Sequence, residues 1–347
     1  MPLDPQVAAF YENKKRQQEN VPPRANPGQS QGFSVDAMRK EADAAFNDKE
    51  EIFPIYFWED RLAALSPEEK EAAGPFFCGG EPFGPPVGVR IYRPGNRQDY
   101  PILLYFHGGG FIMHNIASHD ALCRKLSAVC DCAVVSVQYR LAPEHPYPAC
   151  IQDAWTVLNW AFYRGACLGG DPQKIFVAGD SAGATISAAL CLLSRNKKGP
   201  SIRLQMLFYG SFGCIENEAS PSVAAFGTGE YVLPRPMLDF CMKQYVPRDA
   251  DPSDPYLNPG KAASLSELPP AICVTAQYDP LRDDGEAFFR CLSEAGTPAS
   301  LIPMEGMMHG FLLYWHKFSR AEAFLEALGA WVKAFFQEKA DLPLFSL

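Results

Sequence analysis

The stretch KIFVAGDSAGATISAALCLLSR, residues 174–195, changes character at its centre. It opens on the apolar run 175–178, which is typical of a buried strand, and ends in small and aliphatic residues at helical spacing. Between them stands the pentapeptide GDSAG (179–183), which places Ser181 between two glycines. Glycines allow a strand and a helix to approach closely around a tight turn. A simpler interpretation is that Ser181 only caps the helix and Gly179 ends the strand.

Strand-like and helix-like segments alternate along most of the chain around this stretch. Apolar runs that predict strands lie at 87–94, 101–108, 132–140, 174–179, 202–210, 269–277 and 299–306. Helical spacing falls at 118–131, around 153–160, and at 182–195, 281–295 and 318–338. Nearly continuous apolar strands between helices are typical of a sheet that is covered on both faces. We therefore predict an α/β fold with a mostly parallel central sheet flanked by helices.

Two parts of the chain do not follow the alternation. Residues 1–34 are polar and rich in Pro, Gln and Asn, so we expect them to be loosely ordered, whereas 34–73 shows an amphipathic helical pattern. Residues 211–268 are loop-like, with one short helical stretch, PMLDFCMKQYV, and look like an insertion. We expect 1–73 to contribute to a helical cap, and the insertion at about 211–268 to complete it above the α/β domain 74–347.

Composition argues against several classes of partner. The formal net charge is −9 and the basic clusters are short, so neither nucleic acid nor an anionic membrane is expected to bind. No apolar run is long enough for a signal peptide core or a membrane-spanning helix. The eleven cysteines are irregularly spaced and form no CxxC or Cys/His zinc pattern. We expect mostly free, buried thiols, no metal, and a reducing cytoplasmic location.

The pattern Gly-x-Ser-x-Gly between a strand and a helix is the signature of a nucleophile elbow. A serine hydroxyl needs a base and an orienting acid, which in this architecture follow it in the order acid, then histidine. His309 comes directly after the last predicted strand, whereas His316 is expected to be a surface or packing residue. Asp279 directly follows the preceding strand, while Asp283 and Asp284 open the next helix and suit its dipole. We predict the serine as nucleophile, His309 as base and Asp279 as orienting acid.

A glycine run at the end of another strand supplies candidate donors. Gly108, Gly109 and Gly110 follow His107 in YFHGGGF. Their N–H groups, with that of Ala182, are predicted to form an oxyanion hole, the last two glycines and Ala182 being the favoured donors. His107 is expected to brace the loop. A glycine run can also cradle a phosphate, but no Gly-Lys-Ser/Thr or GxGxxG pattern follows this one.

The order of the motifs resembles the bacterial hormone-sensitive-lipase-like esterases (family IV) of the α/β-hydrolases. The matching segments are HGGGF (107–111), YRLAPEHPYPA (139–149), GDSAG (179–183), DPLRDDGEAF (279–288) and HGF (309–311). This resemblance implies hydrolysis of short-chain carboxylic esters without a cofactor, with Ser181, His309 and Asp279 in the roles given above. It also places the chain in the GDSAG branch through Asp180. A homodimer is compatible with the resemblance, because dimers are common among relatives.

The substrate pocket is the least defined part of the prediction. Candidate pocket residues are Phe111, Asp180, Phe53, Tyr56, Phe57 and Trp58. Within YRLAPEHPYPA, Arg140 and Glu144 are expected to form a partly buried ion pair. An amidase or formamidase with the same triad remains an alternative, as does a non-catalytic binding protein of the kind that the gibberellin receptors represent. Loss of a triad member would favour the binding protein, and all three members are present here.

Overall fold

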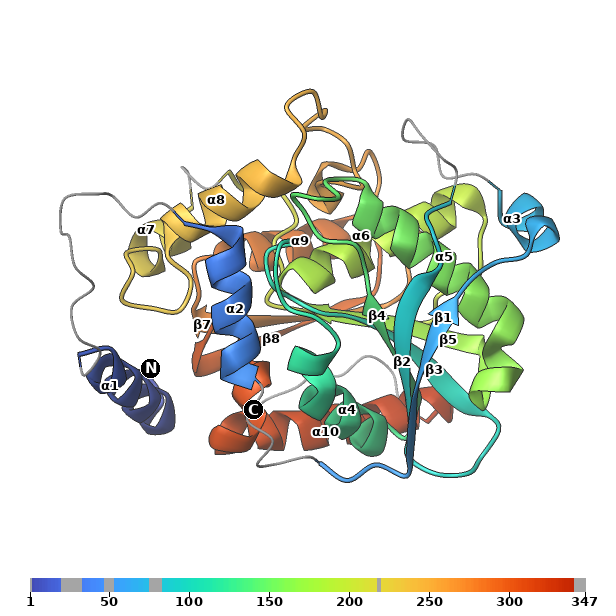
Figure 1. Cartoon of the computed structure of the whole chain (residues 1–347), viewed down its shortest axis with the longest axis horizontal. Helices are drawn as coiled ribbons and strands as arrows, with labels where there is room; N and C mark the ends of the chain where they lie inside the picture. Colours follow the sequence, from blue (N-terminus) through green and yellow to red (C-terminus); the bar gives the residue numbers. More distant parts are fainter. Residues whose placement is uncertain (1, 20–32, 47–52, 75–82, 217–219, 340–347) are drawn as a thin grey trace.

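The computed structural model describes residues 2–19, 33–46, 53–74, 83–216 and 220–339. One eight-stranded sheet runs through the centre of the fold in the order β1-β2-β4-β3-β5-β6-β7-β8 (Figure 1). The strands are β1 (Phe57–Ala63), β2 (Val87–Arg93), β3 (Tyr100–Phe106), β4 (Ala133–Gln138), β5 (Gly170–Asp180), β6 (Gln205–Phe208), β7 (Ala271–Tyr278) and β8 (Ala299–Met308). Strand β2 is antiparallel to both β1 and β4, and the other neighbours pair in parallel. The predicted α/β class is confirmed.

Helices cover both faces of the sheet (Figure 1). The α-helices are α1 (Pro5–Glu19), α2 (Val35–Phe46), α3 (Pro67–Ala73), α4 (Asp120–Cys130), α5 (Ala149–Arg164), α6 (Ala182–Lys197), α7 (Pro221–Phe226), α8 (Arg235–Tyr245), α9 (Arg282–Glu294) and α10 (Ser319–Phe336). Short 3₁₀ helices are η2 (Ala117–His119), η3 (Gly165–Leu168), η5 (Pro259–Lys261) and η6 (Phe311–Lys317). Helices α5, α6 and α9 pack on one face, and α4 and α10 pack on the other.

Strand β3 shows why the apolar runs become central strands. Side chains of a strand point alternately to its two faces. Ile102, Leu104 and Phe106 join the apolar cluster under α5 and α6, while Leu103 and Tyr105 join the cluster under α4 and α10. Because both faces are buried, every residue of the strand is apolar or aromatic except for the proline at 101. The continuous run that predicted this strand therefore reflects burial on two sides.

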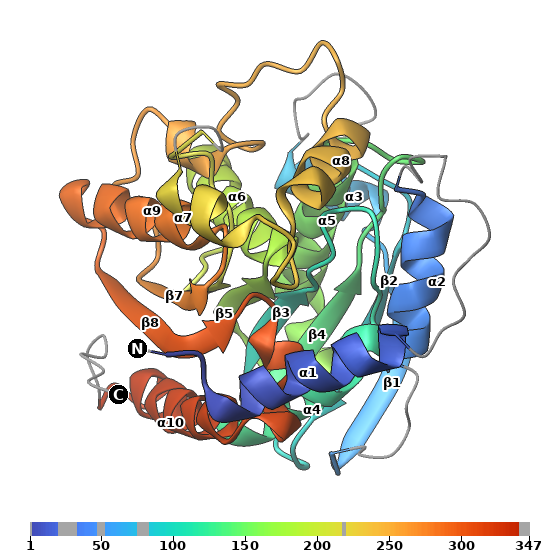
Figure 2. The same ribbon diagram turned by 90° about the vertical axis from the view of Figure 1, so that its left-hand side faces the viewer.

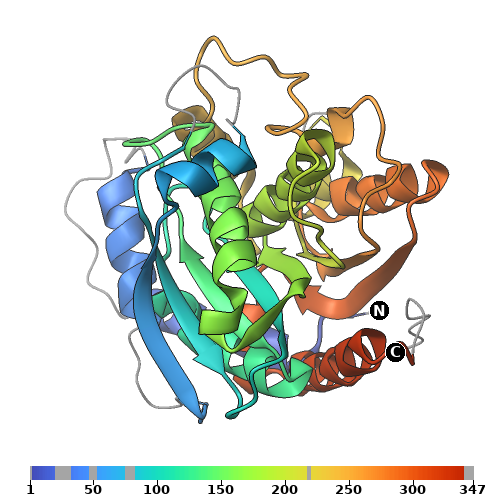
Figure 3. The same cartoon turned by 90° about the vertical axis from the view of Figure 1, so that its right-hand side faces the viewer.

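The N-terminal segment differs from the prediction in two places. Residues 5–19 form helix α1 (Figure 2), where loose order was expected. The helix buries Val7, and its Phe10 packs against Tyr314 and Phe318. Residues 57–63 form edge strand β1, shown in blue in Figure 3, where a helix was expected. Antiparallel pairing with β2 outweighs the helical spacing of this stretch. The parts of both expectations that fall on 20–32 and 47–52 lie outside the described residues.

The described part of the predicted insertion contains the α-helices α7 and α8. Helix α8 is the predicted PMLDFCMKQYV stretch, and the short helix α7 before it was not predicted. Helices α2 and α8 both border the cavity that contains Ser181. Their position agrees with a cap built from the N-terminal segment and the insertion, although residues 217–219 of that insertion lie outside the described part. The domain boundaries themselves stay a prediction.

The described cysteines agree with the sequence-based expectation. Ten are free thiols, and seven of these are buried. Among the described residues no cluster of His, Cys, Asp and Glu is arranged to hold a metal ion. In the same part of the chain, no helix has the length and apolarity needed to cross a bilayer.

Candidate active site

Ser181 stands on the turn between β5 and α6 with φ 53° and ψ −120°. The two flanking glycines make this turn sterically possible. A Cβ on Gly183 would lie 1.9 Å from the carbonyl oxygen of Phe106, and a Cβ on Gly179 would lie 2.3 Å from the carbonyl carbon of Gly183. The side chain of Ser181 makes no capping hydrogen bond to α6. The helix-cap interpretation is therefore not supported, and the hydroxyl is free to face another group.

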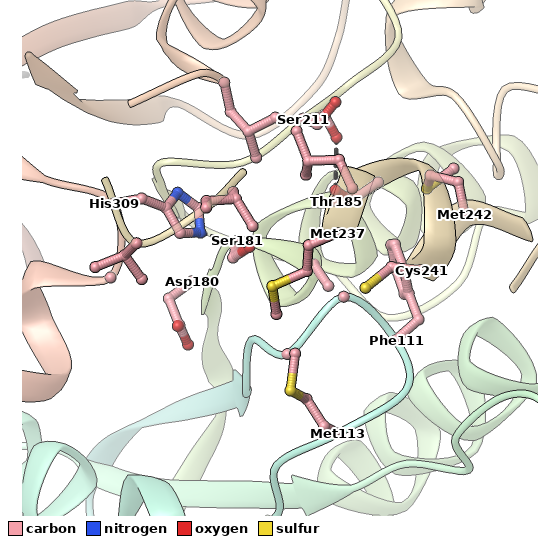
Figure 4. Close-up of a pocket in the computed structure, with 18 of the residues that line it drawn as sticks. Phe111, Met113, Asp180, Ser181, Thr185, Ser211, Met237, Cys241, Met242 and His309 are labelled. Carbon is pink, nitrogen blue, oxygen red and sulfur yellow. Dashed lines mark hydrogen bonds between the residues drawn. The ribbon is translucent and has the colours of Figure 1, made fainter. Parts of the chain in front are cut away.

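The imidazole of His309 joins this hydroxyl to a buried carboxylate. Nε2 of His309 lies 3.0 Å from Oγ of Ser181 (Figure 4). Its Nδ1 lies 2.7 Å from Oδ2 of Asp279. The other carboxylate oxygen accepts a hydrogen bond of 2.8 Å from the N–H of Leu281, and the Asp279 side chain is fully buried. With Nδ1–H donating to Asp279, Nε2 is left as the acceptor that faces the serine. The three predicted residues are brought together.

The alternative candidates lie elsewhere. His316 is exposed at the end of η6 and contacts Trp315, as expected of a surface residue. Asp283 accepts a hydrogen bond of 2.8 Å from the N–H of Ser222 at the start of α7. It therefore ties α9 to the insertion, which agrees with the suggestion that it helps to hold a loop.

Asp284 has a role that the sequence did not reveal. Its carboxylate accepts the N–H groups of Phe212, Gly213 and Ile215 and the hydroxyl of Ser211. These residues form the loop that follows β6, and several of them border the cavity. The helix-dipole interpretation of Asp284 was too simple, because its main partners are donors far away in the sequence.

The glycine loop supplies donors beside the serine, but not all those predicted. The N–H of Gly108 donates to Oδ1 of Asp180 at 2.9 Å, so it is already engaged. Gly109 and Gly110 adopt positive φ values of 114° and 58°. Among the described residues, no protein acceptor takes the N–H groups of Gly109, Gly110 or Ala182. The predicted oxyanion hole is therefore narrowed to these three donors, and Gly108 is corrected to an anchor of the loop.

Asp180 borders the cavity, but its carboxylate is buried beneath the glycine loop. It points away from Met237 and Cys241 (Figure 4), accepts the hydroxyl of Tyr105 at 2.7 Å and lies 3.1 Å from Nε2 of His119. Burial would raise the pKa of Asp180, but His119 and these hydrogen bonds outweigh burial and lower it to about 2. Asp180 thus borders the cavity, as predicted, but its carboxylate is engaged by Tyr105, Gly108 and His119.

His107 braces the loop as expected. Its ring stacks on Tyr139 with centroids 4.2 Å apart, and its Nδ1 lies 2.7 Å from the carbonyl oxygen of Gly108. Burial, with the nearby His119 adding to it, lowers the pKa of His107 to about 3. The ring is therefore neutral near pH 7 and donates from Nδ1 to that carbonyl.

A cavity of about 600 Å³ opens above Ser181. Its apolar wall comes from the loop after β3, from α2 and from α8, and includes Phe111, Met113, Met38, Met237 and Cys241. Phe111 thus borders the cavity, where the sequence placed it, and its ring stacks on that of Tyr245 with centroids 3.8 Å apart. The α2 and α8 residues were not singled out from the sequence, although their helical spacing carried a signal.

The aromatic residues predicted from 53–58 do not border this cavity. Phe53 packs against Trp315, with ring centroids 5.8 Å apart. Trp58 is 47% exposed on β1, and the guanidinium of Arg90 lies over its ring. These residues lie in edge strand β1 or just before it, and not in a cap helix. The prediction that they wall the pocket was therefore wrong.

The predicted pair between Arg140 and Glu144 is not formed. Arg140 binds the buried carboxylate of Asp153 at 2.8 Å, whereas Glu144 binds Arg39 on α2 at 2.7 Å. Arg39 also donates to the carbonyl oxygens of Ile112 and Ala142. Arg39 therefore ties α2 to the loop after β3 and to this motif, which follows β4.

Comparison with known proteins agrees with this geometry. A family model for the alpha/beta hydrolase fold matches residues 103–313, so the chain belongs to the α/β-hydrolases. Esterase LipI of Mycobacterium tuberculosis is 40% identical over 234 residues, which cover 66% of this chain and 72% of LipI. The ethyl acetate hydrolase of Pseudomonas putida is 35% identical over 238 residues, which cover 66% of this chain and 72% of that protein.

A solved structure extends the likeness to nearly the whole chain. The ester hydrolase EH1AB1 from the metagenome of Lake Arreo superposes with a TM-score of 0.83 and 30% identity, over 96% of this chain and 99% of that one. Within the α/β-hydrolases, the protein is a carboxylic ester hydrolase of the hormone-sensitive-lipase-like family.

Proposed function

We propose that the protein hydrolyses short-chain, acetyl-like esters through an acyl-enzyme on Ser181. The observation that carries this proposal is the chain of contacts from Ser181 through His309 to Asp279. The neutral Nε2 of His309 takes the hydroxyl proton as Oγ attacks the ester carbonyl. Asp279 stabilises the imidazolium that results.

The oxyanion that forms in this step faces the free N–H groups of Gly109, Gly110 and Ala182. The start of α6 adds the partial positive charge of a helix N-terminus. His309 returns its proton to the leaving alcohol, and a water molecule then attacks the acyl group with His309 again as the base. Ester hydrolysis by this route needs no cofactor.

The short-chain preference rests on the similarity to an ethyl acetate hydrolase. The apolar wall of the cavity suits the uncharged alkyl parts of such an ester. Assignment to the GDSAG branch rests on the pentapeptide itself. An amidase with the same residues remains the second candidate, because the triad geometry is the same for both reactions.

The proposal is tested with p-nitrophenyl esters of increasing acyl length. We expect the highest kcat/KM with acetyl or butyryl esters, and activity at background level in Ser181→Ala with a folded chain. A fluorophosphonate probe should label Ser181 in the parent protein. Substantial turnover by the variant, or no labelling, contradicts the serine mechanism. Matched p-nitroanilides distinguish the amidase, which would hydrolyse them at rates comparable to the esters.

A further inference from the structure

The buried carboxylate of Asp180 takes no part in the proton transfers proposed above. The residue is 2% exposed. Its Oδ1 accepts the N–H of Gly108 at 2.9 Å and the hydroxyl of Tyr105 at 2.7 Å, and it lies 3.1 Å from Nε2 of His119. One oxygen atom therefore connects the glycine loop, the central strand β3 and the residue that precedes α4.

The hydrogen bond between Asp180 and Gly108 is significant because of where the two residues stand along the chain. Asp180 directly precedes Ser181, and Gly108 directly precedes Gly109. A single hydrogen bond therefore links the nucleophile to the free donors of the glycine loop. The fit is tight, because a Cβ on Gly108 would lie 2.5 Å from Oδ2 of Asp180 and 3.0 Å from its backbone oxygen.

We propose that Asp180 is a positioning residue that fixes the oxyanion hole relative to Ser181. Its carboxylate holds the Gly108 peptide, so that the N–H groups of Gly109 and Gly110 keep their place above the nucleophile. Tyr105 and His119 orient this carboxylate from the side of the sheet and α4. The inference rests on the serine mechanism proposed above.

Loss of the carboxylate would leave two buried donors, the Gly108 N–H and the Tyr105 hydroxyl, without their acceptor. Buried donors without partners are costly, so the loop is expected to shift until they are satisfied. Oxyanion donors act only at hydrogen-bonding distance from the developing charge, and loss of one such donor costs about 10²–10³ in kcat. A shift of the loop should therefore reduce kcat far more than it changes KM.

The test compares Asp180→Ala with Asp180→Asn and with a control, Asp153→Ala. Asparagine keeps a carbonyl oxygen that can accept from Gly108 and Tyr105, so it should rescue most of the activity. Asp153 is an equally buried aspartate that pairs with Arg140 away from the triad. We expect Asp180→Ala to lose about 10²–10³ in kcat with little change in KM. Asp153→Ala should lower Tm and leave kcat nearly unchanged.

Inhibitor binding separates oxyanion positioning from general damage. Oγ of Ser181 adds to the carbonyl carbon of a trifluoromethyl ketone while His309 takes the serine proton, and the resulting oxyanion lies in the oxyanion hole. The methyl ketone of equal length binds without this addition. Asp180→Ala should weaken the trifluoromethyl ketone by about the same factor as kcat and leave the methyl ketone nearly unchanged. Equal weakening of both ketones, or a folded Asp180→Ala with parental kcat, overturns the proposal.

Gly108→Ala gives a second approach that keeps Asp180 in place. Its methyl group would meet the carboxylate and displace the loop, so the same loss in kcat and in trifluoromethyl ketone affinity is expected even if Asp180→Ala does not fold. A Gly108→Ala variant that keeps the parental kcat and the parental affinity for the trifluoromethyl ketone overturns the proposal. Fluorophosphonate titration of the parent separates the two hypotheses: a labelled Ser181 with unaffected variants refutes only the role of Asp180, whereas an unlabelled parent refutes the serine mechanism and this inference with it.

Discussion

The backbone of Ser181 predicts an unusual ranking of two inactive variants. At φ 53° and ψ −120° the residue occupies a region that only glycine enters readily, which costs a residue with a Cβ about 1–3 kcal/mol. Ser181→Ala and Ser181→Gly both remove the hydroxyl next to His309, but only glycine also relieves this strain. Glycine in turn costs about 0.4–1 kcal/mol through the greater entropy of the unfolded chain. The glycine variant should therefore be more stable than the alanine variant by about 1 kcal/mol.

Urea unfolding followed by tryptophan fluorescence measures this difference. At about 2.1 cal/mol/K of unfolding entropy per residue, 1 kcal/mol in a chain of 347 residues shifts Tm by only about 1–2 °C, so midpoints in urea are the better observable. The control is Ala323→Gly on the exposed face of α10, where glycine should destabilise the protein by about 1 kcal/mol. A Ser181→Gly variant that is no more stable than Ser181→Ala would refute the strain argument.

Three further outcomes follow from the contacts around the site. Asp284→Ala removes the acceptor of four donors on the loop 211–215. Urea unfolding should show a free energy of unfolding lower by about 2–3 kcal/mol, and kinetics a raised KM. An unchanged urea midpoint would contradict the role of Asp284 in holding this loop. Arg39→Ala frees α2 from the carbonyl oxygens of Ile112 and Ala142 and should raise KM several-fold while kcat stays nearly constant. A loss confined to kcat would argue against a role of α2 in the pocket wall. Burial lowers the pKa of His107 from 6.5 to about 3, so the unfolded state binds the proton first and stability is lost as pH falls from about 6.5 toward 3. His107→Gln should reduce the slope of unfolding free energy against pH in that window, by at most about 1.4 kcal/mol per pH unit; an unchanged slope would show that the ring is not held neutral.

The central strands could be predicted because burial on both faces produces a continuous apolar run in the sequence. In β3, in the second half of β5 and in most of β7 both faces are buried, so these segments are largely apolar in the sequence. Edge strand β1 has no such apolar run, since one of its faces is exposed at Trp58 and Leu62. Its strand conformation depends on pairing with β2, about 30 residues away. The spacing of apolar residues within β1 carries no information on this pairing.

The triad was predictable for a related reason. Asp279 and His309 each follow an apolar strand directly, and the carboxyl ends of parallel strands meet at one edge of the sheet. The walls of the cavity and the buried anchors were not predictable in this way. Glu144 is four residues from Arg140, yet Arg140 pairs with Asp153, because the turn after β4 brings the start of α5 back to it.

The contact between Ser181 and His309 joins residues that are 128 positions apart. His309 follows β8, which lies at the edge of the sheet and pairs with β7. Contacts between such distant residues form late when a chain folds, because closing a long loop is entropically costly. Tryptophans such as Trp155, packed beneath the centre of the sheet, can therefore regain their fluorescence before any ester is cleaved. During refolding, the return of hydrolysis would report the docking of this last strand.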